Sequence, residues 1–96
     1  MLQIDPDNPA PIYAQLERGV RTAVAAGWLE PGDQLPTVRQ LAVMLRINAN
    51  TVARAYAALE REGVVETQRG VGTFVRPQAE GSGGKSALLA RELQDR

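Results

Sequence analysis

The sequence predicts an α+β fold that is mostly helical, with a core of three helices followed by one two-stranded β-hairpin. Three observations lead to this fold class. The chain has 96 residues, enough for one small domain. Between residues 11 and 62, apolar side chains recur at spacings of three and four in three successive segments, as in helices with one buried face. Two short runs rich in β-branched residues, 64–68 and 73–76, then flank a segment that contains glycines.

The first helix is predicted to begin near Pro11. Residues 1–10 precede it as a lead-in that is rich in Pro, Asp and Asn and is expected to be extended. Proline is tolerated in the first turn of a helix because its missing N–H has no partner there. Gly27 is a suitable end for this helix. Between these limits, helical spacing is shown by Ile12, Leu16, Val20, Ala23 and Val24.

Two further helices are predicted, separated by a short break at residues 47–49. Before them, residues 30–33 have the composition of a turn, and residues 34–36 can form a very short strand. Thr37 and Gln40 have the spacing of a capping box, so the second helix is expected to begin at Thr37. Asn48 is a suitable N-cap for the third helix, which is expected to stop at Gly63. The apolar positions are Val38, Leu41, Ala42 and Leu45 in the second helix, and Val52, Ala55, Tyr56 and Leu59 in the third.

The hairpin and the segments after it complete the predicted organisation. Residues 69–72 form the hairpin tip, and Pro77 ends the second strand, so residues 11–77 make one domain. Residues 78–85 are rich in Gly and are predicted to be a flexible linker. Residues 86–96 are predicted to form a short C-terminal helix. Its leucines either pack on a second subunit or fold back on their own domain.

The composition excludes most enzyme chemistry. The chain has no cysteine and no histidine, so it lacks thiol nucleophiles, imidazole acid–base groups and the usual ligands of transition metals. No acidic cluster has the spacing of a metal site, and no cofactor is predicted. No apolar stretch is long enough to span a membrane and no signal peptide is visible, so a cytoplasmic location is expected. A binding module, not an enzyme, is therefore predicted.

The charges are unevenly distributed along a chain whose formal net charge is zero. Residues 37–59 carry Arg39, Arg46 and Arg54 and no acidic residue, and residues 69–79 carry Arg69 and Arg76 and no acidic residue. Acidic residues outnumber basic ones in residues 1–36 and 60–68. If the fold brings the two basic segments to one face, that face attracts nucleic acid although the whole molecule is neutral.

The second and third helices have the arrangement of a helix-turn-helix, whose second helix can enter the major groove of DNA. The hairpin that follows predicts the winged form of this motif. On the third helix, at about residues 48–62, Asn50 and Arg54 lie opposite the apolar face. Asn and Arg side chains pair with adenine and guanine edges, respectively. Thr51, near the start of the same helix, is expected to donate to a phosphate.

Two other segments are expected to contact DNA. Arg39, near the start of the second helix, is suited to hold a phosphate. The wing, over residues 64–76, carries Arg69 and Gly70 at its tip. Arginine is favoured by the negative potential of narrow minor grooves, so the wing is expected to reach the minor groove or the backbone.

Residues 11–76 resemble the DNA-binding domain of the GntR family of bacterial transcription regulators, and most of all its short YtrA-like subfamily. The resemblance rests on several motifs in the same order, namely PIYAQL, LEPGDQLPTVRQLA, NANTVARAY, LEREG and RGVGTFV. It implies a winged helix that binds palindromic operator DNA as a homodimer, usually as a repressor. The family's DNA contacts, transferred to this chain, fall on Thr37, Arg39, Asn48, Asn50, Thr51, Arg54, Arg69 and Gly70.

The chain departs from the wider family in two respects. Ala49 and Ala53 stand where many relatives outside the subfamily carry larger polar or basic residues, so neither is expected to contact bases. The sequence also ends before the large effector domain that most members have, and the identity of any small-molecule effector stays open. YtrA-like members end instead in a pair of helices that forms the dimer, so the resemblance implies that residues 86–96 are a truncated dimerisation element.

Simpler interpretations of the candidate residues are also open. Arg39 can pair with a nearby acid such as Asp33. Thr37 and Asn48 can serve only as helix caps, and Gly70 only as a turn former. Asn50 and Arg54 can be solvated side chains without a DNA contact. The alternative function is a winged-helix module for protein interaction with weak DNA affinity, which the neutral net charge and the leucines of residues 86–96 favour.

Overall fold

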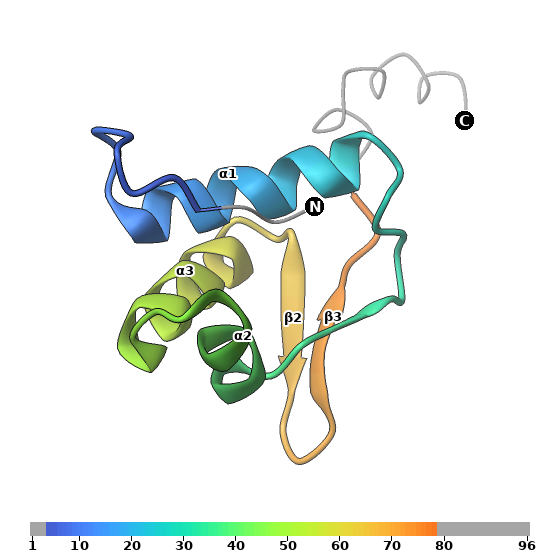
Figure 1. Ribbon diagram of the computed structural model, residues 1–96. Coiled ribbons are helices and arrows are strands. Elements are labelled where there is room, and N and C mark those ends of the chain that lie inside the picture. Colours follow the sequence, from blue (N-terminus) through green and yellow to red (C-terminus); the bar gives the residue numbers. More distant parts are fainter. Residues whose placement is uncertain (1–3, 79–96) are drawn as a thin grey trace.

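The computed structural model describes residues 4–78, which form three helices and three short strands (Figure 1). This architecture confirms the predicted fold class. The predicted C-terminal helix and all but the first residue of the predicted linker lie outside the described residues. The elements are α1 (Ile12–Ala25), β1 (Gln34–Leu35), α2 (Val38–Leu45), α3 (Ala49–Arg61), β2 (Val65–Gln68) and β3 (Gly72–Val75).

The lead-in folds back onto the start of α1. The backbone N–H of Asn8 donates to the carbonyl of Asp5 at 3.0 Å, which closes a turn. The Gln15 side chain accepts from the Asp5 N–H at 2.8 Å and donates to the Ala10 carbonyl at 3.0 Å. The expected extended conformation is therefore wrong for this segment, because the turn and Gln15 satisfy its backbone groups locally. Ile4 packs against the core as a result.

The starts of α2 and α3 follow the predicted capping signals. The Thr37 hydroxyl accepts from the Gln40 N–H at 3.0 Å, and the Gln40 side chain accepts from the Thr37 N–H at 2.9 Å, so the capping box is complete. The side-chain oxygen of Asn48 accepts from the Asn50 N–H at 2.7 Å and caps α3. Between the helices, Arg46 has left-handed backbone geometry (φ 59°), which ends α2 and turns the chain into α3.

The sheet contains the predicted two-stranded wing and, as a third strand, the very short strand expected within residues 34–36, whose pairing with the wing was not predicted. Its order is β1-β3-β2, and neighbouring strands are antiparallel. β2 and β3 form the predicted hairpin, with Gln68 opposite Gly72. The short strand β1 pairs with the other edge of β3, where Gln34 lies opposite Phe74. The segment that leads into α2 is therefore joined directly to the hairpin.

The hydrophobic core is centred on α3, which packs against α1, α2 and β2 (Figure 1). Burial of these apolar side chains supplies the main favourable term in folding. Within residues 4–78, the hydroxyl of Tyr56 is the one polar side-chain group on a buried residue, and each helix is too short or too polar to cross a lipid bilayer. The six largest side chains with almost no solvent exposure are Leu16, Leu41, Leu59, Val20, Val52 and Val65.

An ion-pair network joins α1 to the C-terminal end of α3. Arg21 donates to both carboxylate oxygens of Glu62, at 2.9 and 3.1 Å, and to Glu17 at 3.1 Å. The hydrogen bond with Arg21 lowers the pKa of Glu62, and the same bond raises the pKa of Arg21. Because all these side chains reach solvent, the network contributes less than about 1 kcal/mol to stability. Glu62, the C-cap of α3, thus lies at the opposite end of this helix from its N-terminal turn.

Candidate nucleic-acid interface

The N-terminal turn of α3 presents polar side chains to solvent. Asn48 and Asn50 are exposed, and Thr51 is half-buried. The Asn48 oxygen is occupied by the helix cap, whereas the Asn50 side chain makes no hydrogen bond within residues 4–78. An amide on an exposed helical turn can pair with the donor and acceptor groups of an adenine edge. The backbone N–H groups of this turn can also bind a phosphate.

The start of α2 adds a hydroxyl and a guanidinium. Thr37 is exposed, and its oxygen accepts the capping bond, so the hydroxyl hydrogen stays available as a donor. Arg39 is also exposed. The alternative pairing of Arg39 with Asp33 is not found, because the ion pairs within the described residues do not include Arg39. The Asp33 carboxylate instead accepts from the Glu30 N–H at 2.8 Å.

The wing tip is the third exposed segment. Arg69 and Gly70 are exposed, and Val71 is 60% exposed. Gly70 has φ +77°, a conformation that residues with a Cβ rarely adopt, although a Cβ there would meet no atom within 4 Å. The Val71 N–H donates to the Gln68 carbonyl at 2.9 Å and closes the turn. The glycine thus permits the tight turn from which Arg69 projects.

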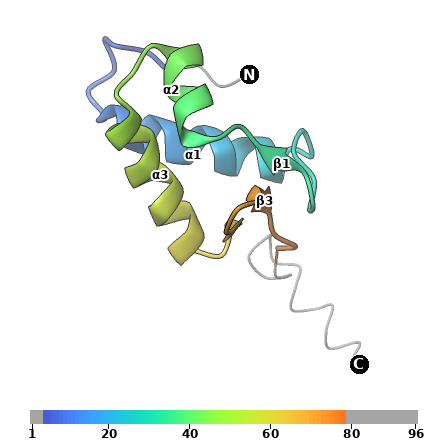
Figure 2. The same ribbon diagram turned by 90° about the horizontal axis from the view of Figure 1, so that it is seen from below.

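These three segments lie on the side of the molecule away from α1. Figure 2 views that side, with α2, α3 and the hairpin in front of α1, and in Figure 1 the hairpin tip points away from α1. Arg39, Arg46 and Arg69 are exposed and form no ion pair with any described residue. The structure therefore brings one part of each basic segment, the starts of α2 and α3 and the wing tip, to one side, where unpaired positive charge attracts phosphate. Arg76 is not part of this group, because it follows β3 and lies 3.8 Å from Glu66.

Arg54 lies in a different environment from the other candidates. Its guanidinium carbon is 3.8 Å from the centroid of the Tyr13 ring on α1, which is a cation–π contact. The sequence predicts Arg54 only on the exposed stripe of α3, whereas the structure packs Tyr13, which is partly buried, against the core. The stack gives Arg54 a packing role between two helices. Its side chain remains exposed, so the donors along the guanidinium edge stay accessible to a DNA base.

Tyr56 connects α3 to the start of α2. Its hydroxyl donates to the Pro36 carbonyl at 2.7 Å, and the residue is 6% exposed. Pro36 immediately precedes the capping residue Thr37, so this bond fixes the beginning of α2 relative to α3. Burial raises the pKa of Tyr56 to about 12. The position of the helix-turn-helix start thus depends on one buried hydroxyl.

We expect Tyr56→Phe to lower the free energy of unfolding by about 1–2 kcal/mol at pH 7, because the Pro36 carbonyl loses its hydrogen-bond partner. The effect depends on pH. An unfolded tyrosine has a pKa near 10, so stability due to the raised pKa is complete below about pH 10 and is lost as the pH rises toward 12. Urea unfolding at pH 7 and pH 11 checks this result. If the wild type and Tyr56→Phe lost equal amounts of stability between pH 7 and pH 11, the raised pKa of Tyr56 would not be the cause of the loss.

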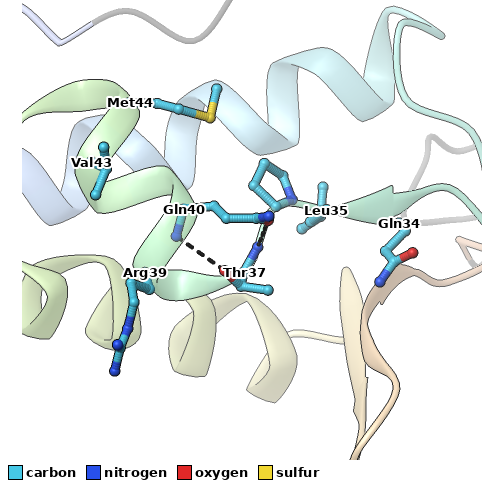
Figure 3. A pocket seen from close by; sticks show the side chains of 8 residues that line it. Gln34, Leu35, Thr37, Arg39, Gln40, Val43 and Met44 are labelled. Carbon is cyan, nitrogen blue, oxygen red and sulfur yellow. Dashed lines mark hydrogen bonds between the residues drawn. The ribbon is translucent and has the colours of Figure 1, made fainter.

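A shallow groove of about 850 Å³ runs beside α2 and β1 (Figure 3). Val43 and Met44 line it and are 73% and 66% exposed. Arg39 also lines the groove and points away from Met44. Within the described part of the chain, no group of three acidic residues is placed to hold a metal ion. An open groove beside the interface offers a macromolecule a surface and does not enclose a small ligand.

Three residues that the sequence does not select belong to this side or support it, namely Gln34, Tyr13 and Arg46. Arg46 is visible in the sequence only as part of a basic segment. The structure places it in the turn between α2 and α3, where it is exposed. Tyr13 and Gln34 act through contacts with residues far along the chain, and a single sequence carries no signal for such contacts.

Comparison with known sequences gives the family. A sequence profile of bacterial regulatory proteins of the gntR family matches residues 12–75. The chain is 42% identical, over 98% of its length, to the HTH-type transcriptional repressor YtrA of Bacillus subtilis, of which the match covers 74%. Two further bacterial regulators are 44% and 49% identical to this chain, and the matches cover 58% and 61% of their lengths.

Solved structures agree with this result. YtrA from Sulfolobus acidocaldarius, a GntR-family transcription factor, is similar with a TM-score of 0.78 and 34% identity over 96% of each chain. AraR(DBD) in complex with operator ORX1 has a TM-score of 0.70 and 25% identity, covering 77% of this chain and 95% of that one. The profile match includes the whole helix-turn-helix and the hairpin, and it is a match to transcription regulators and not to enzymes. The chain belongs to the GntR family of bacterial regulatory proteins.

Proposed function

We propose that the protein is a sequence-specific repressor that binds double-stranded operator DNA through a winged helix-turn-helix. One observation carries this proposal. The exposed starts of α2 and α3 and the tip of the wing lie on one side of the fold, and this side bears arginines that pair with no carboxylate among residues 4–78. DNA presents a row of phosphates together with base edges, and this combination of charge and amide groups suits both.

In the proposed complex, α3 lies in the major groove. Asn50 pairs with an adenine edge, and the guanidinium edge of Arg54 pairs with a guanine while its face stays on Tyr13. Asn48 and Thr51 contact the phosphates that border the groove. The small side chains of Ala49 and Ala53, on the first two turns of α3, are exposed and allow close approach of the helix.

The remaining contacts position the protein on the backbone. Thr37 and Arg39 at the start of α2 hold phosphates on one side of α3. Arg69 enters the minor groove from the wing tip, where the missing side chain of Gly70 lets the backbone come near the DNA. These contacts fix the register of α3 and supply most of the salt-dependent affinity.

We further propose that the protein binds a palindromic site as a homodimer in the cytoplasm. One winged helix makes few phosphate contacts, and two copies on two half-sites supply the affinity that specific binding needs. The repressor role follows from the similarity to YtrA of Bacillus subtilis, which is named a transcriptional repressor. Operator binding is supported by the similarity to AraR(DBD), which was solved in complex with operator DNA.

The proposal is tested with duplexes selected from a random-sequence pool by repeated binding to the intact chain. Fluorescence anisotropy then gives the affinity for the most enriched duplex and for a shuffled duplex at several salt concentrations. We expect the enriched duplex to bind at least about 1,000-fold more tightly than the shuffled one. We also expect Arg39→Ala to reduce the slope of log affinity against log salt by about one for each protomer bound.

Arg18→Ala is the matched control, because Arg18 is an exposed arginine on α1 and is absent from the ion pairs of the described residues. It removes the same charge and should leave the slope unchanged. Failure to enrich any duplex, or an affinity that does not fall with salt, would refute DNA recognition and favour a protein-interaction module. Equal effects of the two substitutions would show that net charge, and not the start of α2, governs binding.

A further inference from the structure

Gln34 makes a direct contact between the segment that precedes α2 and the tip of the wing. Its side-chain amide donates from Nε2 to the Val71 carbonyl at 3.2 Å. Figure 3 shows the Gln34 side chain pointing toward the hairpin. Gln34 is exposed, so the bond fills no core and satisfies no buried group. The bond instead connects two elements at the surface, 37 positions apart in the sequence.

Gly72 makes room for this contact. A Cβ at Gly72 would collide with Gln34 Nε2 and would lie 3.3 Å from Gln34 Cδ. Among the described glycines with positive φ, the others have no atom within 4 Å of the position where a Cβ would lie, so this collision is specific to Gly72 (φ +148°). The Gln34 side chain therefore occupies the space that a side chain at Gly72 would fill. The hairpin and Gln34 fit together at this position.

The same segment continues directly into the helix-turn-helix. Gln34 pairs with Phe74 in the sheet, Pro36 accepts the Tyr56 hydroxyl at 2.7 Å, and Thr37 then caps α2. One end of this segment is thus fixed to the wing and the other end to α2 and α3. The hydrogen bond to Val71 is the link closest to Arg69 and Gly70, the candidate minor-groove residues.

We propose that Gln34 is a positioning residue that holds the wing tip at a fixed distance from the starts of α2 and α3, so that both reach DNA together. The proposal rests on the DNA-binding function proposed above. It assigns to Gln34 no contact with DNA. Its action is through the Val71 carbonyl and therefore through the geometry of Arg69 at the tip.

The test compares Gln34→Met with Gln15→Met. Methionine keeps the unbranched stem and approximate volume of glutamine but donates no hydrogen bond. Gln15 also donates from its amide to backbone carbonyls, but it lies on α1 and holds the lead-in. Two readouts are measured, namely the ¹H–¹⁵N heteronuclear NOE of residues 69–72 in the protein without DNA, and the Kd for the enriched duplex. The Kd is measured in the wild-type background and in the Arg69→Ala background.

We expect Gln34→Met to lower the NOE values of residues 69–72 and to weaken binding about 5- to 10-fold in the wild-type background. In the Arg69→Ala background the same substitution should change the Kd less than twofold, because the tip residue that Gln34 positions is gone. Gln15→Met should change neither readout.

Three results would overturn the proposal. Unchanged NOE values would show that Gln34 does not hold the tip. An unchanged Kd with lower NOE values would show that the fixed tip is not needed for DNA binding. Equal weakening in both backgrounds would indicate a direct contact between Gln34 and DNA. Failure of the wild-type chain to bind any duplex is a separate result, which refutes the proposed function, while the NOE values still decide whether Gln34 holds the tip.

Discussion

Replacing Leu59 with alanine is expected to lower the free energy of unfolding by about 3 kcal/mol, the typical loss for a fully buried leucine. Leu59 is 0% exposed and belongs to the core cluster that α3 shares with α1, α2 and the sheet. The substitution leaves a cavity that surrounding elements can fill only partly. Small domains have total stabilities of roughly 5–15 kcal/mol, so much of the native stability is lost. Urea unfolding followed by circular dichroism measures the change.

Met44→Ala is the control for this prediction. It also truncates a long apolar side chain, but Met44 is 66% exposed on α2, so the expected change is within about 0.5 kcal/mol. A loss below about 1 kcal/mol for Leu59→Ala, or equal losses for the two variants, would mean that α3 is not the centre of the core.

Asn50→Asp is expected to weaken binding to the enriched duplex at least about 100-fold, or about 2.8 kcal/mol, without unfolding the protein. Asn50 is exposed in the first turn of α3, whose N-terminus favours negative charge by about 0.3–1 kcal/mol, so the fold should gain slightly in stability. Against DNA the same charge faces phosphates, and the carboxylate cannot donate to a base. Fluorescence anisotropy and thermal unfolding measure the two effects.

Thr22→Asp introduces the same charge at an exposed position of α1, and α1 lies away from the hairpin tip (Figure 1). It should weaken DNA binding less than threefold, since exposed charges more than a Debye length apart are largely screened. If Asn50→Asp bound DNA as tightly as the wild type, α3 would not lie in the groove as proposed. If it unfolded the protein, the loss of binding would say nothing about contacts, and Asn50→Ala would replace it in the test.

The local features of this fold could be predicted because each depends on neighbours in the sequence. The capping box of Thr37 and Gln40 joins residues three apart, and the Asn48 cap joins residues two apart. The hairpin follows from two β-branched runs around glycines, of which Gly70 adopts the positive φ that the turn requires. Signals of this kind lie within a few residues of one another, so they can be recognised in a single sequence.

The contacts between distant segments could not be predicted in the same way. The pairing of β1 with β3 adds a third strand to the sheet, and residues 34–36 alone show no preference for that partner. The bond from Gln34 to Val71 spans 37 positions, and the stack of Arg54 on Tyr13 joins two different helices. Such contacts depend on how the helices and the sheet pack around the core. They give Gln34 and Arg54 neighbours that the local sequence pattern does not show.

Dimethyl sulfate footprinting of the enriched duplex tests the DNA-binding mode most directly. The reagent methylates guanine N7 in the major groove and adenine N3 in the minor groove, so one experiment reports both grooves. The account predicts protected guanines at two symmetric half-sites, with protected adenines nearby that lose protection in Arg69→Ala, while Asn50→Asp removes both patterns. Protection confined to the minor groove, or guanine protection that persists in Asn50→Asp, would contradict recognition by α3.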